Sequence, residues 1–340
     1  MAMKSLLLAT ALLAPALFAT TASASVTPPT PTGAAPVGFT RTTLTDYFRS
    51  EPIAGDSGPR RVPLRVWYPA AAPGAQPALT MTAVEQAEWE RSLGDLPPGT
   101  LDGIGSAATA GARPARGSHP VLLMSPGRAE PAALMSAQAS DLASHGYVVV
   151  GIDVPGETVA VDLGDGQLVP LSPALDHASE ESIALRSRDL RFVRSRLGSL
   201  QGVGRLDLQR VGAYGHSNGG ATAAHAMDLD RRIRAGVNID GSMWGPVVQR
   251  GLDRPFGVIQ GNEFDGAYDT IDEFRSHLRG PRPFVQVPDT RHHSFTDFVW
   301  VVPQLGADPV ESEVGTIDPA AMVQLQNTLL RRFFDAYTRG

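Results

Sequence analysis

The sequence predicts an α/β fold, with a mostly parallel central sheet, helices on both faces and an antiparallel hairpin at the N-terminal edge. Three observations lead to this class. Strand-like apolar runs alternate with helix-like segments from residue 120 onward. Segments 39–48 and 62–68 flank a turn, and 61–68 alternates apolar and polar residues as hairpin strands do. A short apolar strand at 211–214 runs directly into a glycine-rich turn and a small-residue helix.

The first 24 residues are typical of a signal peptide. Lys4 supplies the positive charge, residues 6–18 form the apolar centre, and 22–24 read Ala-Ser-Ala, a small-residue cleavage site. The apolar run is short for a membrane span, so no transmembrane anchor is expected. These features predict a secreted or periplasmic protein cleaved near Ala24.

Beyond the signal peptide we expect a disordered leader at 25–38, rich in Thr, Pro and Ala, and a single domain at 39–340. An insertion at about 78–117 is longer than an ordinary connection. It forms either a lid over the site or a surface excursion packed on the edge of the core.

Composition narrows the class of protein. The chain has 340 residues, no cysteine and a formal net charge of −6. Without cysteine, a disulfide framework and thiol catalysis are excluded. A mildly acidic chain without a long basic run argues against nucleic acid as the main partner, and a monomer is expected.

The order of predicted elements completes the fold. Strands are predicted at 120–124, 147–152, 211–214, 235–239, 256–260 and 283–287, and helices at 131–145, 179–197, from 221, 270–278 and 319–337. The helix at 179–197 is amphipathic. Ile183, Leu190, Val193 and Leu197 share one face, and Arg186, Arg188 and Arg194 are expected to face solvent.

Residues 215–219 read Gly-His-Ser-Asn-Gly, the G-x-S-x-G pattern of the nucleophile elbow in α/β-hydrolases. A serine on such a sharp strand-to-helix turn has a strained backbone, and glycine on either side removes the Cβ atoms that would collide. We therefore predict Ser217 as a nucleophile at the carboxyl edge of the sheet. The alternative is an ordinary Gly/Ser turn.

A serine nucleophile needs a histidine base and a carboxylate that orients it, and in this fold the chain order is Ser, acid, His. His292 and His293 alone follow the last predicted strand, and adjacent residues cannot both face one point. Spacing favours Asp265 as the acid, with Asp240 and Glu263 as alternatives.

The oxyanion hole is expected to use the backbone N–H of Asn218 and one from loop 125–128. Pro126 has no N–H, so Arg128 is the candidate, with Gly127 second. The alternative for this loop is a plain turn.

Several segments together resemble the plasma-type platelet-activating-factor acetylhydrolases. Residues 215–222 are similar to the elbow of that family, 240–244 (Asp-Gly-Ser-Met-Trp) to its Asp-x-x-Met stretch, and 292–298 to its His-x-x-Phe-x-Asp-Phe segment. Segments 66–69 and 142–147 also agree, so the resemblance covers roughly residues 40–340. It implies Asp240 as the acid and His292 as the base, and implies that Phe295, Asp297 and Phe298 fix the loop of the base.

The chain departs from that family at two places. Pro126-Gly127 stands where the family usually has His-Gly, and Asn218 stands where an aromatic residue is usual. Both changes make a phospholipid substrate less expected. Exported bacterial esterases and polyester hydrolases share the general design, and a wider, more polar site would suit them.

The sequence and the resemblance together predict a secreted, cofactor-free serine esterase that forms an acyl-enzyme on Ser217. Short-acyl or phospholipid-type esters are the expected substrates, and Met243, Trp244 and His216 are the candidate substrate-binding residues. Met243 and Trp244 would alternatively cover the core. No zinc-ligand spacing is present. The rival predictions are a polyester (cutinase-like) or peptide hydrolase with the same triad, and a non-catalytic binding protein on this fold.

Overall fold

The structure is a computed structural model that describes residues 25–51, 58–94, 96–164, 166–173, 178–262, 269–308 and 312–339. The predicted signal peptide at 1–24 lies outside the described residues. So do Glu263 and Asp265, two of the three candidate acids. Within the described ranges, no helix combines the length and apolarity that crossing a membrane requires.

A 10-stranded sheet forms the centre of the molecule, in the order β12-β11-β10-β9-β5-β6-β2-β1-β4-β3. Neighbours from β12 to β6 pair in parallel, whereas β2 pairs antiparallel with both β6 and β1. The predicted parallel sheet with an antiparallel N-terminal hairpin is thus confirmed. The strands are β1 (Val37–Ser50), β2 (Pro59–Pro69), β3 (Gln76–Pro77), β4 (Thr109–Ala110), β5 (Ser118–Ser125), β6 (Val148–Ile152), β9 (Arg205–His216), β10 (Ala235–Ile239), β11 (Phe256–Gly261) and β12 (Phe284–Val287).

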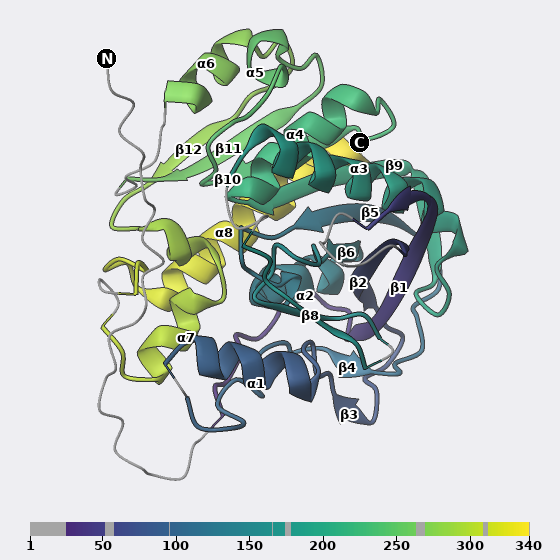
Figure 1. The fold of residues 1–340 in the computed structure, drawn as a ribbon, viewed down its shortest axis with the longest axis vertical. Helices are drawn as coiled ribbons and strands as arrows, with labels where there is room; N and C mark the ends of the chain where they lie inside the picture. Colours follow the sequence, from purple (N-terminus) through teal and green to yellow (C-terminus); the bar gives the residue numbers. More distant parts are fainter. Residues whose placement is uncertain are drawn as a thin grey trace.

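Helices cover both faces of this sheet (Figure 1). They are α1 (Ala83–Ser92), α2 (Ser136–Ser144), α3 (Glu180–Arg196), α4 (Asn218–Leu229), α5 (Val247–Arg250), α6 (Asp269–His277), α7 (Phe298–Gln304) and α8 (Pro319–Phe334). Short helical turns are η1 (Ala132–Met135), η2 (Leu197–Ser199), η3 (His292–Phe295) and η4 (Asp335–Arg339). A separate hairpin, β7 (Ala160–Asp162) with β8 (Leu168–Pro170), follows β6.

The strands divide the core into two clusters, because successive side chains of a strand point to opposite faces. In β5, Leu122 and Met124 pack with residues of α2 and α8, whereas Val121 and Leu123 pack with residues of α3 and α4. All four side chains are fully buried. A strand buried on both faces accounts for the continuous apolar run in the sequence.

Residues 25–38, predicted to be a disordered leader, instead pack against the domain. Val26 is buried, and its N–H donates to the carbonyl of Thr100. The Thr32 N–H donates to Asp141 Oδ1 at 2.7 Å, and the Gly33 N–H to Ser144 Oγ at 2.9 Å. The prediction was wrong because these hydrogen bonds to α2 hold the segment, and a Thr/Pro/Ala composition does not reveal them.

The insertion adds α1 to the fold and places β3 and β4 beyond β1 at the sheet edge. Figure 1 shows α1 at the end of the molecule opposite α5 and α6. Glu85 of α1 is fully buried and accepts hydrogen bonds from Arg65 of β2 at 2.9 Å and from the Asp162 N–H at 2.9 Å. Met81 and Trp89 belong to the main core cluster. The insertion is therefore fastened to the edge of the core.

The arginines of α3 depart from the expected solvent-facing pattern. The predicted apolar face (Ile183, Leu190, Val193 and Leu197) is buried as expected. Arg188 is exposed, but Arg186 is only 1 % exposed and Arg194 is 7 % exposed. Arg186 is buried because acceptors for its guanidinium come from other parts of the chain, which helical periodicity cannot indicate.

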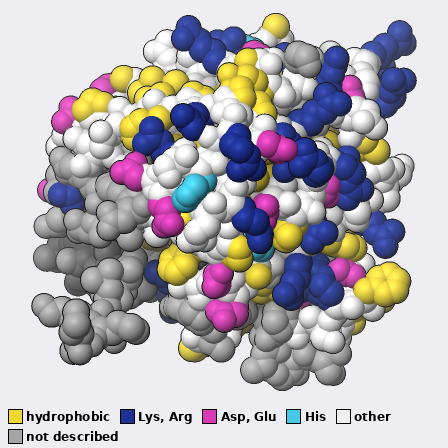
Figure 2. All heavy atoms as spheres, turned by 90° about the horizontal axis from the view of Figure 1, so that it is seen from above, with side chains coloured by type: hydrophobic (Ala, Val, Ile, Leu, Met, Phe, Trp, Pro, Cys, Tyr) yellow, Lys and Arg dark blue, Asp and Glu magenta, His cyan; other side chains and the backbone are white. Residues whose placement is uncertain are grey.

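The face seen from the α5–α6 end carries many basic side chains with acidic ones among them (Figure 2). The loops that follow α4 and α5 contain ion pairs such as Arg231–Asp253 at 2.8 Å and Arg232–Asp230 at 2.7 Å. Arginines of these pairs are largely exposed, and exposed ion pairs contribute little to stability individually. This face is therefore of mixed sign rather than a continuous cationic strip.

Candidate active site

Ser217 lies at the turn between β9 and α4 and has φ 53° and ψ −124°, a region that residues other than glycine rarely adopt. The flanking glycines explain how the turn is accommodated. A Cβ on Gly215 would lie 2.4 Å from the Ser125 carbonyl oxygen, and one on Gly219 only 1.9 Å from it. A strained serine at the start of a helix, with backbone packed against both sides, is the geometry of a nucleophile elbow.

Asp240 immediately follows β10 and is fully buried. Its φ is 50°, and its backbone N–H donates to the Ile259 carbonyl at 2.8 Å. The Gly261 N–H donates to Asp240 Oδ1 at 2.8 Å. The backbone around β11 thus fixes both the bend at Asp240 and the orientation of its carboxylate.

The structure brings Asp240 and His292 together. His292 Nδ1 lies 2.7 Å from Asp240 Oδ2, and the imidazole is mostly buried at 18 % exposure. The carboxylate oxygen can only accept, so a neutral His292 carries its proton on Nδ1 and presents Nε2 as the basic nitrogen. The Ser217 N–H donates to the Ile239 carbonyl, next to Asp240, so the elbow and the acid meet at one edge of the sheet.

Two buried charged residues, Glu130 and Arg186, hold the loop after β5. Glu130 was not identified from the sequence, and Arg186 was expected to face solvent. Glu130 Oε2 accepts the Gly127 N–H at 3.1 Å. Arg186 of α3 donates to the Pro126 carbonyl at 2.8 Å and to the Gly127 carbonyl at 3.2 Å. The sequence offers no distinctive signal for Glu130, because a single glutamate in a loop has no characteristic spacing.

These contacts fix the direction of the Arg128 N–H. The Gly127 carbonyl and the Arg128 N–H belong to one peptide group, and the described residues contain no cis peptide bond. In a trans peptide the N–H points opposite to the C=O. Because Arg186 binds the Gly127 carbonyl, the Arg128 N–H points away from Arg186. The Gly127 N–H is engaged by Glu130, which disfavours it as the second oxyanion donor.

Comparisons with known proteins point to ester hydrolases. Residues 182–338 match the family model described as platelet-activating factor acetylhydrolase, isoform II. The ferulic acid esterase from Streptomyces cinnamoneus superposes with a TM-score of 0.82 at 29 % identity, over 93 % of this chain and 94 % of that one. The chain is an α/β-hydrolase that resembles the platelet-activating factor acetylhydrolases.

Two curated relatives are similar over part of their length. A probable 1-alkyl-2-acetylglycerophosphocholine esterase of Arthroderma benhamiae is 27 % identical over 63 % of this chain and 59 % of its own. The platelet-activating factor acetylhydrolase of Cavia porcellus is 24 % identical over 64 % of this chain and 57 % of its own. The alignments thus span less than two thirds of these relatives. Their names, with that of the structural neighbour, support a carboxylic ester hydrolase.

Two of the three predicted substrate-binding residues of this α/β-hydrolase are buried in the protein. Met243 is 2 % exposed and packs in the core, where its Sδ lies 3.3 Å from Asn238 Nδ2. His216 is fully buried, and both ring nitrogens contact protein acceptors. Their prediction as substrate contacts is therefore corrected. Trp244 is partly exposed and stays a candidate for the pocket wall.

Asn218, the first residue of α4, carries the other predicted oxyanion N–H. Its position at a helix N-terminus favours a developing negative charge. Asn218 is 5 % exposed, and its Nδ2 has no hydrogen-bond partner within the described part of the chain. The departure from the usual aromatic residue thus places an amide next to the nucleophile.

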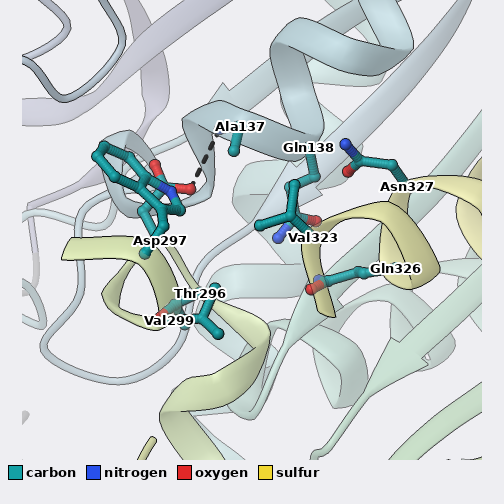
Figure 3. Close-up of a pocket in the computed structure, with 9 residues that line it drawn as sticks. Ala137, Gln138, Thr296, Asp297, Val299, Val323, Gln326 and Asn327 are labelled. Carbon is teal, nitrogen blue, oxygen red and sulfur yellow. Dashed lines mark hydrogen bonds between the residues drawn. The ribbon is translucent and has the colours of Figure 1, made fainter. Parts of the chain in front are cut away.

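The segment after His292 is anchored to two helices. Asp297 accepts hydrogen bonds from the Ser136 N–H at 2.9 Å and the Ala137 N–H at 3.2 Å, at the start of α2 (Figure 3). Gln138 of α2 and Gln326 of α8 both donate to the Phe295 carbonyl, at 3.2 and 3.0 Å. The small pocket in Figure 3 lies among these anchoring residues. This arrangement is consistent with the loop-fixing role that the resemblance implied for Phe295 and Asp297.

Among the described residues, His216, Asp240 and His292 each place a potential metal-ligand atom within 4.8 Å of the others. Hydrogen bonds account for this proximity. Asp240 Oδ1 accepts the Gly261 N–H, and Asp240 Oδ2 contacts His292 Nδ1. His216 Nδ1 faces Glu130, and His216 Nε2 faces the His292 carbonyl. We assign no metal to these three residues.

Proposed function

We propose that this α/β-hydrolase is a secreted serine esterase in which Ser217, His292 and Asp240 form the catalytic triad. The observation that carries the proposal is the 2.7 Å contact between His292 Nδ1 and Asp240 Oδ2, beside a serine held at a strained elbow. An acid that fixes the tautomer of a histidine, near a partly exposed serine, is the arrangement that acyl transfer requires.

In the proposed reaction, Ser217 Oγ attacks the ester carbonyl carbon and its proton passes to His292 Nε2. The carbonyl oxygen becomes an oxyanion, which the Asn218 and Arg128 N–H groups stabilise. One such donor typically contributes about 10²- to 10³-fold in rate. The C–O bond then breaks, and the leaving alkoxide takes the proton from His292. Water, deprotonated by the same imidazole, attacks the acyl-Ser217 carbonyl carbon. The acyl–Oγ bond then breaks, His292 returns the proton to Ser217 Oγ, and the acid is released.

For the substrate, we propose a short-acyl ester, with a hydroxycinnamoyl ester as the second candidate. The curated relatives are named for acetyl esters, but they align over only part of their length. The ferulic acid esterase matches nearly the whole chain. Asn218 in place of an aromatic residue also favours a more polar acyl pocket than a phospholipid enzyme would need.

The test uses purified protein with p-nitrophenyl esters of increasing acyl length, methyl ferulate and an acetylated glycerophospholipid. Ser217→Ala should abolish both hydrolysis and covalent labelling by a fluorophosphonate, because both require the serine hydroxyl. Hydrolysis that survives in Ser217→Ala would refute the triad. A wild-type protein that hydrolyses no ester and takes up no label would favour a binding protein on this fold.

Secretion is part of the proposal and rests on the signal-like first 24 residues. Mass spectrometry of the exported protein should show a mature N-terminus near Ser25. Retention of the full chain inside the cell would refute this part without affecting the proposed chemistry.

A further inference from the structure

A second histidine–carboxylate pair lies next to the proposed triad. His216 Nδ1 is 3.1 Å from Glu130 Oε2, and His216 Nε2 is 2.9 Å from the His292 backbone carbonyl. His216 is fully buried and Glu130 is 5 % exposed. The rings of His216 and His292 are 4.4 Å apart between centroids. The pair therefore touches both the loop after β5 and the segment that carries the proposed base.

The hydrogen bonds of His216 indicate its charge. With Glu130 ionised, both partners of His216 are acceptors, a carboxylate oxygen and a backbone carbonyl, so both ring nitrogens donate. An imidazole that donates from both nitrogens is an imidazolium. Burial alone would lower the pKa of His216, but the charge of Glu130 and the hydrogen bond to it outweigh burial and raise that pKa. Burial likewise opposes ionisation of Glu130, yet His216 lowers the pKa of Glu130 to about 2.

Resting on the proposed function, we propose that the His216 imidazolium, paired with Glu130, is a positioning residue that holds the oxyanion loop and the loop of the catalytic base in one fixed arrangement. Glu130 extends the link by accepting the Gly127 N–H. His216 extends it in the other direction by donating to the His292 carbonyl. One buried ion pair thus joins the two halves of the site, and neither His216 nor Glu130 needs to touch the substrate.

Other titratable groups face the pair and influence its protonation. His293 Nε2 lies 3.7 Å from Glu130 Oε1, and the carboxylate of Asp240 also favours the charged form of His216. A neutral His216 would carry one ring proton and could donate to only one of its two partners. Loss of the proton would therefore break the link of His216 either to Glu130, which accepts the Gly127 N–H, or to the carbonyl of His292.

The first experiment needs no substrate. ¹H–¹⁵N NMR of the histidine side chains, assigned with His216→Phe, should show His216 protonated on both nitrogens from about pH 5 to about pH 8, beyond the range of an ordinary histidine. Glu130→Gln should abolish this state near neutral pH. A single ring proton on His216 of the wild type at neutral pH would overturn the proposal, whether or not the protein hydrolyses esters.

The second experiment separates positioning from general stability. His216→Phe should lower kcat for p-nitrophenyl acetate by about 10²-fold with little change in KM, since displacing a catalytic group by about 1 Å can cost that much. Glu130→Gln should lower kcat in the same direction, and the double variant should fall short of the sum of the two effects because they act through one pair.

The matched control is Glu51→Gln. Glu51 is also a buried carboxylate in an ion pair, with Arg60 at 2.5 Å, but it lies in the N-terminal hairpin region. The Glu51→Gln variant should be less stable than the wild type, but its folded form should keep the wild-type kcat. A folded His216→Phe with the kcat of the wild type, or an equal fall in Glu51→Gln, would overturn the proposal.

Discussion

Replacing Asp240 by asparagine is expected to reverse the tautomer of His292 without disturbing the backbone. Asparagine tolerates the positive φ of this position as aspartate does. The Gly261 N–H, 2.8 Å from Oδ1, needs an acceptor, so the amide oxygen stays there and the NH₂ group faces His292 Nδ1. A donor facing Nδ1 moves the ring proton to Nε2, which is the nitrogen that must accept the proton of Ser217.

The size of the expected fall in kcat follows from the loss of the correct His292 tautomer. An asparagine that imposes the wrong tautomer in a Ser-His-Asp site costs about 10⁴-fold in kcat, or about 5 kcal/mol of transition-state stabilisation. The assay is kcat for p-nitrophenyl acetate, with circular dichroism melting to establish that the variant is folded. Asp265→Asn, at the position that spacing favours, should leave kcat nearly unchanged. A larger loss in Asp265→Asn than in Asp240→Asn would refute the assignment of the acid.

Three further predictions concern the surroundings of the proposed triad. Gly219→Ala should destabilise the protein by about 3 kcal/mol or more in chemical denaturation, because the new Cβ would lie 1.9 Å from the backbone oxygen of Ser125, which cannot rotate away. Arg186→Lys should lower kcat by about 10²-fold with KM little changed, because a single ammonium cannot replace the contacts that orient the Gly127 carbonyl. The pKa of Glu130 is lowered to about 2, so its pairing adds stability above about pH 4.5 that is lost as the pH falls. The stability advantage over Glu130→Gln should therefore shrink by about 3 kcal/mol between about pH 4.5 and about pH 2.

Each of these has an outcome that would count against it. A Gly219→Ala protein as stable as the wild type would mean that the elbow is looser than described. Unchanged kcat in Arg186→Lys would remove Arg186 from the support of the oxyanion loop. A stability difference for Glu130→Gln that does not vary with pH would contradict an ion pair at Glu130.

The sequence predicted the elements that have a local signature. The strand at 235–239 coincides with β10, and the helix at 179–197 differs from α3 by only one residue at each end. Strand β9 begins well before the predicted 211–214. Its outer residues, 205–210, alternate Leu206 and Leu208 with polar residues and are all at least partly exposed, so the continuous apolar run marks only the buried part of the strand. Helix α7 was missed, and it contains Pro303 near its end, a residue that usually argues against a helix.

In the candidate site too, the residues with a local sequence signature were predicted and those that act through long-range contacts were not. Ser217 sits in a contiguous motif, and Asp240 and His292 were chosen through resemblance of short segments to a known family. Spacing alone favoured Asp265, since a generic rule about chain order cannot tell which of two neighbouring strands supplies the acid. Glu130 and Arg186 act through contacts between residues distant in sequence, which no local pattern of a single chain encodes.

The amide of Gln326 gives the C-terminal helix α8 a part in preparing the site. Two amides hold the Phe295 carbonyl, and one comes from α8. A polypeptide released before residue 319 would contain all three residues of the proposed triad and still lack half of this clamp. Catalytic activity should consequently arise late in folding, when α8 docks. Truncation or a bulky fusion at the C-terminal end should lower turnover although it lies away from the site.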